Sequence, residues 1–341
     1  MKILIAGGAG FIGSTVASAL LDAGHHPVLL DNLSTGRIEF AAGRTFYQGD
    51  IADGELLDRI FVEHPDIAAA VHCAALIVVP DSVSHPVHYY RENVAKTLEL
   101  VDGLLRNGCH RLVFSSSASI YRPGPDLSVD ETSALEPLSP YGRTKVMVEQ
   151  VLADVAAASD LRVASLRYFN PIGADPQLRT GQQRPRPSHA LGQLMSAHQD
   201  GVPFQVTGTD YPTADGTGMR DYVHVWDLAL AHVRVLEAFD EVLGGPQHDL
   251  VLNLGTGRGT TVRELVAAFN RVVDTPVGVV DAGRRPGDTV GGYTRTDRAA
   301  RLLGWRAERS LAQGIEDTLA WAERRPALLG EPAPAAAATA R

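Results

Sequence analysis

The chain has 341 residues with 31 basic and 40 acidic side chains, a formal net charge of −9 at neutral pH. At roughly 150 residues per domain, this length predicts two domains and a core that needs no disulfide or metal to fold. The acidic balance disfavours nucleic acid and anionic membranes as partners, and two cysteines are too few for a disulfide framework. No stretch approaches the ~18 apolar residues of a membrane-spanning helix. We therefore expect a soluble, cytoplasmic protein with no nucleic-acid or membrane partner.

Short apolar runs alternate with amphipathic stretches through the first half of the chain. The apolar runs predict strands at 3–6, 28–31, 45–48, 69–73, 112–115 and 163–167. The amphipathic stretches predict helices at 11–23, 54–63, 87–106 and 140–158. Strands that alternate with helices indicate crossover units, and hence an α/β fold with a doubly wound parallel sheet.

The pattern changes after Pro171. Residues 174–189 and 207–219 are typical of long loops, and strands resume at 222–225 and 251–255. The Ala/Pro-rich end from Pro326 predicts a disordered tail. We therefore expect a nucleotide-binding domain at 1–173 to which the chain returns around 220–255, a smaller domain mainly at 174–325, and a tail at 326–341.

A glycine-rich turn follows the first predicted strand and opens the first predicted helix. Gly7, Gly10 and Gly13 allow a tight turn and close approach of the backbone to a pyrophosphate at the helix N-terminus. Asp31 ends the second strand, where a carboxylate binds the ribose hydroxyls and repels a 2′-phosphate. The pattern predicts NAD rather than NADP. The alternative is a structural turn with a helix-capping aspartate.

Ser115, Ser116 and Ser117 end a predicted strand, and Tyr141 and Lys145 share one face of a later helix. A phenol with a pKa of ~10 is a poor base, but a nearby ammonium and a cationic nicotinamide would lower that pKa. A serine hydroxyl can hydrogen-bond the reacting oxygen. A tyrosine four residues before a lysine is common by chance. Here the lysine of the pair, Lys145, is one of only three lysines in the chain, which makes a chance match less frequent.

Other short segments extend this pattern along the chain. They are Asp31-Asn32, Gly49-Asp50-Ile51, His72-Cys73-Ala74-Ala75, Tyr89-Tyr90-Arg91-Glu92-Asn93, Arg167-Tyr168-Phe169-Asn170-Pro171, Asp210-Tyr211-Pro212-Thr213, Asp215-Gly216-Thr217-Gly218, Arg220-Asp221-Tyr222-Val223-His224-Val225 and Arg285-Pro286-Gly287-Asp288. With these motifs the chain resembles, over about residues 1 to 323, the extended short-chain dehydrogenases/reductases. Within them it resembles the UDP-galactose (UDP-glucose) 4-epimerases, and the stretch at 210–225 is the most specific part of that resemblance.

The resemblance implies a Rossmann sheet with a smaller C-terminal substrate-binding domain, and a homodimer packed through helices 87–106 and 140–158. It implies that Ser117, Tyr141 and Lys145 are catalytic. It implies that NAD is held by Gly7, Gly10, Phe11, Ile12, Gly13, Asp31, Asn32, Asp50, Ile51, Cys73, Ala74, Ala75, Asn93, Ser115, Tyr141, Lys145 and Tyr168. It implies that a UDP-hexose is held by Ser117, Tyr141, Phe169, Asn170, Arg220, Arg285, Asp288 and Gly292.

The chain departs from the family pattern at several positions. Ile77 stands where a lysine is common, Arg122-Pro123 replaces a glycine segment, and Pro187-Ser188-His189-Ala190 replaces a Pro-Asn-Asn-Leu segment. Gly292 falls on the position beside the sugar C2 group, and its missing side chain predicts that UDP-N-acetylglucosamine is also a substrate. If the alignment is shifted by one residue, Tyr293 closes that pocket instead.

The leading interpretation is a 4-epimerase that interconverts UDP-glucose and UDP-galactose through a 4-keto intermediate. A UDP-glucuronate 4-epimerase keeps the same serine, tyrosine and lysine and stays open as an alternative. A 4,6-dehydratase would need an acidic pair where Ser117 is followed by Ala118-Ser119. An alternative of another class is a catalytically silent NAD-sensing protein. The paired histidines His25-His26 and His85/His88 have no completing ligand set, so no metal is expected.

Overall fold

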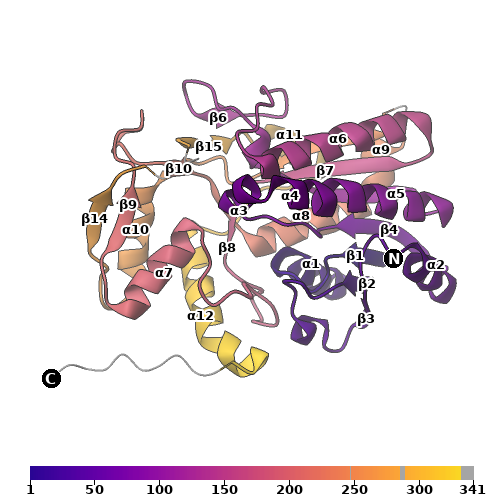
Figure 1. Ribbon diagram of the computed structural model, residues 1–341, viewed down its shortest axis with the longest axis horizontal. Helices are drawn as coiled ribbons and strands as arrows, with labels where there is room; N and C mark the ends of the chain where they lie inside the picture. The colour runs from indigo at the N-terminus through magenta and orange to yellow at the C-terminus, as the bar shows by residue number, and fades with distance from the viewer. Residues whose placement is uncertain (246, 285–288, 332–341) are drawn as a thin grey trace.

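A seven-stranded parallel sheet forms the centre of the first domain, in the order β12-β7-β5-β4-β1-β2-β3. The computed structural model describes residues 1–245, 247–284 and 289–331 (Figure 1). The strands of this sheet are β1 (Lys2–Ala6), β2 (His26–Asp31), β3 (Thr45–Gln48), β4 (Ile67–His72), β5 (Arg111–Ser117), β7 (Arg162–Tyr168) and β12 (Asp249–Leu254). The expected doubly wound Rossmann sheet is confirmed, with every predicted strand of the first half in place.

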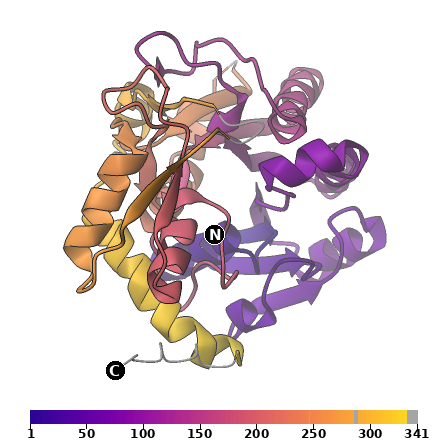
Figure 2. The same ribbon diagram turned by 60° about the vertical axis from the view of Figure 1, so that its left-hand side comes forward.

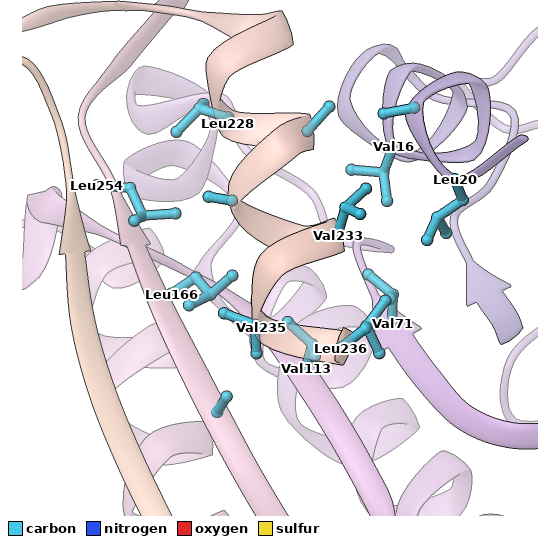
Figure 3. Packing of buried hydrophobic residues seen from close by; sticks show 14 of the residues in the cluster. Val16, Leu20, Val71, Val113, Leu166, Leu228, Val233, Val235, Leu236 and Leu254 are labelled. Atoms are coloured by element: carbon cyan, nitrogen blue, oxygen red, sulfur yellow. The ribbon is translucent and has the colours of Figure 1, made fainter. Parts of the chain in front are cut away.

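The two faces of this sheet are covered by different helices, because successive side chains of a strand point to opposite faces. Ile3 and Ile5 of β1 pack in one core and Leu4 and Ala6 in the other. The first core holds α1 (Phe11–Asp22) and α8 (Val225–Glu237); the second holds α2 (Gly54–Glu63), α5 (Lys96–Arg106) and α6 (Pro140–Ala158). Figure 3 shows α8 in the first core, where its apolar face lies against Val16, Leu20, Val71, Val113, Leu166 and Leu254.

The predicted helix at 87–106 is interrupted. The chain forms α4 (Pro86–Tyr90), a π-helical turn η2 (Arg91–Ala95) and then α5. This turn carries Asn93, whose side chain accepts from Leu76 N at 2.8 Å and donates to Leu76 O at 2.9 Å. The wide turn therefore ties the helix to the loop after β4, and local π turns of this kind recur near functional sites.

Of the two strands predicted after Pro171, the one at 251–255 joins the main sheet as β12 and the one at 222–225 does not. β11 (Tyr222–His224) does not join the main sheet; it pairs with β8 (Asn170–Ile172) in a separate parallel ladder. The return is made by α8 and by β12, which pairs with β7 at the sheet edge. Ala299 of α11 (Asp297–Leu303) and Trp305 also pack in the first core, so the chain comes back a second time.

The second domain gathers on one side of the molecule (Figure 2). Its core lies among α7 (Ala190–Asp200), α10 (Val262–Val272), α12 (Leu311–Leu329) and the parallel strands β9 (Phe204–Thr207) and β14 (Val279–Ala282). A four-stranded sheet, in the order β13-β10-β15-β6, lies beside it. Its strands are β6 (Ser128–Val129), β10 (Met219–Arg220), β13 (Thr260–Thr261) and β15 (Gly291–Thr294).

Short elements complete the described chain: α3 (Val79–Ser84), α9 (Phe239–Leu243), η1 (Ile38–Ala41) and η3 (Ala118–Ile120). The start predicted for the disordered tail is wrong, because α12 continues past Pro326 to Leu329. Leu329 is buried with Phe40 and Trp321, and its carbonyl accepts from Arg37. The rest of the predicted tail, 332–341, lies outside the described residues. Within those residues, no helix has the length and apolar character to cross a membrane.

Candidate active site

The glycine turn after β1 has no room for a side chain at Gly7 or at Gly13. Gly7 has a φ of 81°, and a Cβ there would lie 2.5 Å from Ala74 N. A Cβ at Gly13 would lie 2.2 Å from Gly7 O. Gly10 is the N-cap of α1, and no side chain caps that helix within the described residues. The N–H groups of the first turn therefore remain for an outside acceptor, which fits a pyrophosphate.

Asp31 lies at the end of β2, beside this turn, and is 7% exposed. Its carboxylate accepts from Ala9 N at 2.9 Å and from Leu33 N at 2.8 Å. Burial raises its pKa, and these two hydrogen bonds oppose the change. A Cβ at Gly36 would lie 2.7 Å from Asp31 Oδ1, so the glycine leaves this side of the carboxylate uncovered. The arrangement fits a ribose with two free hydroxyl groups.

Asp50 and Asn32 lie next to each other, since Asn32 Nδ2 donates to Asp50 Oδ2 at 3.3 Å. Asp50 has a further partner that was not predicted, Lys96, whose Nζ lies 2.6 Å from Asp50 Oδ2 and 2.8 Å from Glu92. The scarcity of lysine could have drawn attention to it. The other predicted cofactor residues surround the glycine turn: Phe11 and Ile12 open α1, Ile51 follows β3, and Cys73, Ala74 and Ala75 follow β4.

Asn93 lies close to this region, but its side-chain amide forms hydrogen bonds with other protein groups. Besides its two bonds to Leu76, it donates to Thr144 Oγ1 at 3.1 Å. It supports the loop that follows Ala75, instead of pointing a free amide into the site. Cys73, predicted to lie within a strand, is just beyond β4 and is half-buried. Burial raises the pKa of its thiol to about 11, so it is inert near neutral pH.

Ser117, Tyr141 and Lys145 come together where β5 ends and α6 begins. Ser139 caps α6 by accepting from Gly142 N at 3.1 Å, and Pro140 occupies its first turn. Tyr141 is 9% exposed and Lys145 is 4% exposed. Ser117 Oγ donates to Ser119 Oγ at 3.0 Å, and Ser117 also hydrogen-bonds Tyr141. The predicted tyrosine and lysine thus share one buried helix face.

The expected effect of the ammonium on Tyr141 is absent from this structure. Burial raises the pKa of Tyr141, with only the hydrogen bond to Ser117 opposing it. Lys145 Nζ instead donates to Ser115 O at 2.7 Å and lies 4.7 Å from the centre of the Phe114 ring. Burial lowers the pKa of Lys145 to about 8. The ammonium holds the backbone of β5, and the protein alone leaves Tyr141 a neutral phenol.

Two groups of hydrogen-bonded, buried side chains lie beside this site, and their contacts were not predicted because the partners have no fixed spacing in the sequence. Of their members, Ser115 and Tyr168 were predicted as cofactor residues, whereas Arg167, Glu149 and His232 were not predicted as site residues. Arg167 is 4% exposed; it donates to Glu149 through Nε at 3.0 Å and to Tyr121 Oη at 2.6 Å. Glu149 lies one helical turn after Lys145 on α6. The second group joins Tyr168, at the end of β7, to Ser115 and to His232 of α8.

Besides Ser117 and Tyr141, the predicted substrate residues that the structure describes come from β8 and the segment before it, and from β10 and β15. Phe169 packs with Ile120, Tyr121 and Val129, and Asn170 opens β8. Arg220 donates to Met219 O at 2.7 Å, Val290 O at 3.0 Å and Thr289 O at 3.3 Å, so its guanidinium lies against the backbone of 289–290. Arg285 and Asp288, predicted to bind the UDP group, lie outside the described residues.

Gly292 lies in β15, beside Arg220 of β10. The expected opening at this position is not present. A Cβ at Gly292 would lie 2.5 Å from Leu127 O and 3.1 Å from Pro123 Cγ. The loop with the unusual Arg122-Pro123 therefore fills the space that the missing side chain leaves, and Tyr293 N donates to Leu127 O at 3.0 Å.

No group of three or more histidine, cysteine, aspartate or glutamate side chains that could bind a metal occurs in 1–245, 247–284 or 289–331.

Comparison with known proteins gives a consistent result. Residues 3–255 match the model of the NAD dependent epimerase/dehydratase family. UDP-glucose 4-epimerase of Azospirillum brasilense is 43% identical over 323 residues, which cover 94% of this chain and 91% of that protein. Among solved structures, UDP-glucose-4-epimerase of Stenotrophomonas maltophila with bound NAD and formylated UDP-arabinopyranose has a TM-score of 0.88 and 37% identity, covering 95% of this chain and 98% of the other. The Bifidobacterium longum enzyme in complex with NAD+ and UDP has a TM-score of 0.87 and 32% identity, covering 96% and 99%.

Proposed function

Since the chain belongs to the NAD dependent epimerase/dehydratase family, we propose that it interconverts UDP-glucose and UDP-galactose by inverting C4. The cofactor is NAD and the intermediate is a 4-keto sugar. One observation carries the proposal beyond the family: a half-buried serine and a buried tyrosine and lysine lie together at the carboxyl end of β5. The uncapped glycine turn opens at the same edge of the sheet.

In this reaction Tyr141 exchanges a proton with the 4-hydroxyl group, and Ser117 hydrogen-bonds the same oxygen. Bound NAD supplies a hydride acceptor for C4 and, when oxidised, a positive charge that favours the phenolate form of Tyr141. That charge is needed because burial alone raises the pKa of Tyr141. Lys145 keeps Ser115, and with it the end of β5, in place through its hydrogen bond to the carbonyl group.

The UDP group is held between the domains. Arg220 lies next to the backbone of 289–290, where its guanidinium can also turn a donor toward a diphosphate. The nucleotide anchors the substrate, while the sugar turns and presents its other face after oxidation. Asn170 and Phe169, from β8 and the segment before it, line the same substrate.

The test is to incubate the purified protein, with no added cofactor, separately with UDP-glucose, UDP-N-acetylglucosamine and UDP-glucuronate. Epimer ratios are read by NMR. We expect UDP-galactose from UDP-glucose and bound NAD in the protein as purified. Conversion of UDP-glucuronate alone would favour a uronate epimerase, and bound NAD without any conversion would favour a silent NAD-binding protein. UDP-N-acetylglucosamine tests the expectation from Gly292 that this sugar is also a substrate. Because the loop at 123–127 fills the space beside Gly292, absence of conversion would agree with the structure.

We also propose that the protein is a homodimer. Apolar side chains on the helices expected at the interface are exposed: Val87 of α4 at 61%, Leu98 of α5 at 44% and Met147 of α6 at 41%. Contact between two such surfaces removes this area from water. Sedimentation velocity should give twice the mass of the chain, and a charged residue in place of Val87 should shift the protein toward monomer. A monomer at all concentrations would contradict the proposal.

We place the reaction in the cytoplasm, because Cys73 and Cys109 are both free thiols. Unpaired cysteines are typical of a reducing compartment. Fractionation of cells that produce the protein should recover it in the cytoplasmic fraction, and recovery from an oxidising compartment would contradict this placement.

A further inference from the structure

A chain of buried, hydrogen-bonded side chains runs from helix α8 to the end of β5. His232 of α8 is 0% exposed and Tyr168 of β7 is 5% exposed. The Tyr168 hydroxyl lies 2.5 Å from His232 Nε2 and 3.0 Å from Ser115 Oγ. The main-chain carbonyl of Ser115 accepts from Lys145 Nζ at 2.7 Å. Contacts thus continue from α8 to the lysine of the proposed catalytic set.

The direction of the hydrogen bonds is fixed at the α8 end. His232 Nδ1 lies 2.8 Å from Leu228 O, and a carbonyl oxygen can only accept, so Nδ1 carries the proton. Burial lowers the pKa of His232 to about 4, which keeps the ring neutral near pH 7. Nε2 then has no proton, and the hydroxyl of Tyr168 must donate to it.

This direction limits what the Tyr168 phenol can do. Its one proton is held by His232, so toward Ser115 its oxygen offers lone pairs only. Ser115 Oγ lies within reach of both this oxygen and Cys73 Sγ, and when its single proton points to Tyr168 the thiol of Cys73 is left to donate to Ser115. Burial raises the pKa of Tyr168 well above its ordinary value, and a hydrogen bond that requires the phenolic proton favours the same neutral form. Of the two tyrosines in the site, Tyr141 alone is then free to exchange a proton with a substrate.

We propose that His232 is a positioning residue, whose bare Nε2 fixes the orientation of Tyr168 and, through Ser115, the place of Lys145. The inference rests on the proposed function in one respect, namely that the nicotinamide of bound NAD lies beside Tyr168. His232 was not predicted as a site residue, because a single histidine on an apolar helix face belongs to no sequence motif. Its partner Tyr168 comes into contact with it only because α8 packs against β7 in the folded protein.

The test compares three single variants of the NAD-loaded protein. His232→Phe removes the acceptor and keeps a ring of similar size, whereas His232→Gln keeps a side-chain acceptor. His224→Gln is the matched control, because His224 is also buried, at the N-cap of the same helix, and bonds Trp226 N and Asp317 instead of Tyr168. The first readout needs no sugar: the bound nicotinamide is reduced with borohydride and its fluorescence emission is recorded. The second is kcat and KM for UDP-glucose.

We expect His232→Phe to shift the emission and to lower kcat about tenfold, the effect of one lost hydrogen bond, with KM changed less than about twofold. His232→Gln should restore most of both properties. His224→Gln should lower the unfolding temperature and leave emission and kcat unchanged. The proposal is overturned if His232→Phe has wild-type emission and kcat, or if His224→Gln reproduces its changes.

A second pair of variants decides the question if His232→Phe does not fold. Tyr168→Phe breaks the same hydrogen bond from the other side and keeps the imidazole, so it should shift the emission alike. His232→Leu removes the acceptor with a smaller side chain, so it should shift the emission, and the double variant Tyr168→Phe/His232→Leu should add no further change to Tyr168→Phe. An additive change would contradict coupling between the two residues. The fluorescence emission tests the role of His232 without any sugar substrate. A wild-type protein that converts no UDP-glucose would contradict the proposed function but would leave this test of His232 intact.

Discussion

Burial acts on the pKa values of Tyr141 and Lys145 in opposite directions, although both residues lie on one face of α6. It raises that of Tyr141 and lowers that of Lys145 to about 8, because the charged form of each group is disfavoured in a dry site. Tyr141 is therefore a neutral acid in the resting protein. It acts as a base only while a positive charge lies next to it.

The first prediction concerns this tyrosine. Tyr141→Phe removes the hydroxyl and leaves the ring, so the fold and the NAD content should stay and turnover should fall by about 10²–10⁴-fold, as for a lost acid–base group. Turnover is measured by NMR of UDP-galactose formation, and bound NAD by release on denaturation. Tyr47→Phe is the control and should keep full turnover, since it loses the same hydroxyl group at a position where the partners are Glu63 and His64 instead of Ser117. Near-wild-type turnover in the phenylalanine variant would remove Tyr141 from the catalytic role.

Asp31 carries the second prediction. Asp31→Ala removes the acceptor for the ribose hydroxyls and the charge that repels a 2′-phosphate, so NAD should bind more weakly and NADP should be discriminated against less. The loss should exceed that of a ribose contact alone, because Ala9 N also loses its acceptor in the glycine turn. Titration calorimetry of both nucleotides on stripped protein measures the two affinities. A wild-type preference for NADP would contradict the assignment.

Individual site residues were predictable where the chemistry sets a spacing. The glycine turn, Asp31 and the tyrosine-lysine pair each follow from short-range geometry, and the structure brings them to one edge of the sheet. The contacts of Lys96 and His232 were not predictable, because Asp50 and Tyr168, their partners, lie far away in the sequence. Such pairs are decided by packing between elements, about which a local pattern carries no information.

Among the helices and strands, too, features set by local sequence were predictable and features set by packing were not. The helices at 54–63 and 140–158 were predicted to the residue, because a polar cap precedes a periodic apolar face. The π turn η2 was missed since it interrupts an amphipathic pattern without changing it. β11 was placed in the wrong sheet because a strand's period predicts its conformation but not its partner.

The third prediction concerns β15 and the loop at 123–127. Gly292→Ala puts a Cβ within 2.5 Å of Leu127 O, so the loop must shift, and we expect a loss of about 1–3 kcal/mol in unfolding free energy, as for overpacking. Gly278→Ala is the control, with nothing within 4 Å of its Cβ. Denaturant unfolding measures both variants. Equal stability of Gly292→Ala and wild type would mean that the position is open after all, as the sequence predicted.

At the scale of the whole molecule, the two domains are joined by contacts on the segment at 175–184. Arg179 pairs with Asp22 of α1 at 2.7 Å, Thr180 contacts Thr15 of α1, and Gln182 O accepts from Trp321 of α12. A stretch expected to be a long loop is thus an ordered connection between the first domain and α12. Its order comes from partners on both sides, which its own Pro- and Gln-rich composition does not reveal.

The last prediction concerns how the unfolding free energy of the protein depends on pH. Burial lowers the pKa of His72 to about 3 and that of His232 to about 4, from an ordinary value of 6.5. Between about pH 6.5 and pH 4 the unfolded chain therefore binds more protons than the folded one, and the unfolding free energy falls as pH falls. Each histidine contributes a slope of about 1.4 kcal/mol per pH unit in that window and none above it. His72→Gln, which can still bond Thr97, should make the fall less steep in urea unfolding series from pH 7 to pH 4.5. The exposed His88→Gln is the control and should follow wild type; equal slopes for His72→Gln and wild type would mean that His72 gains its proton without unfolding.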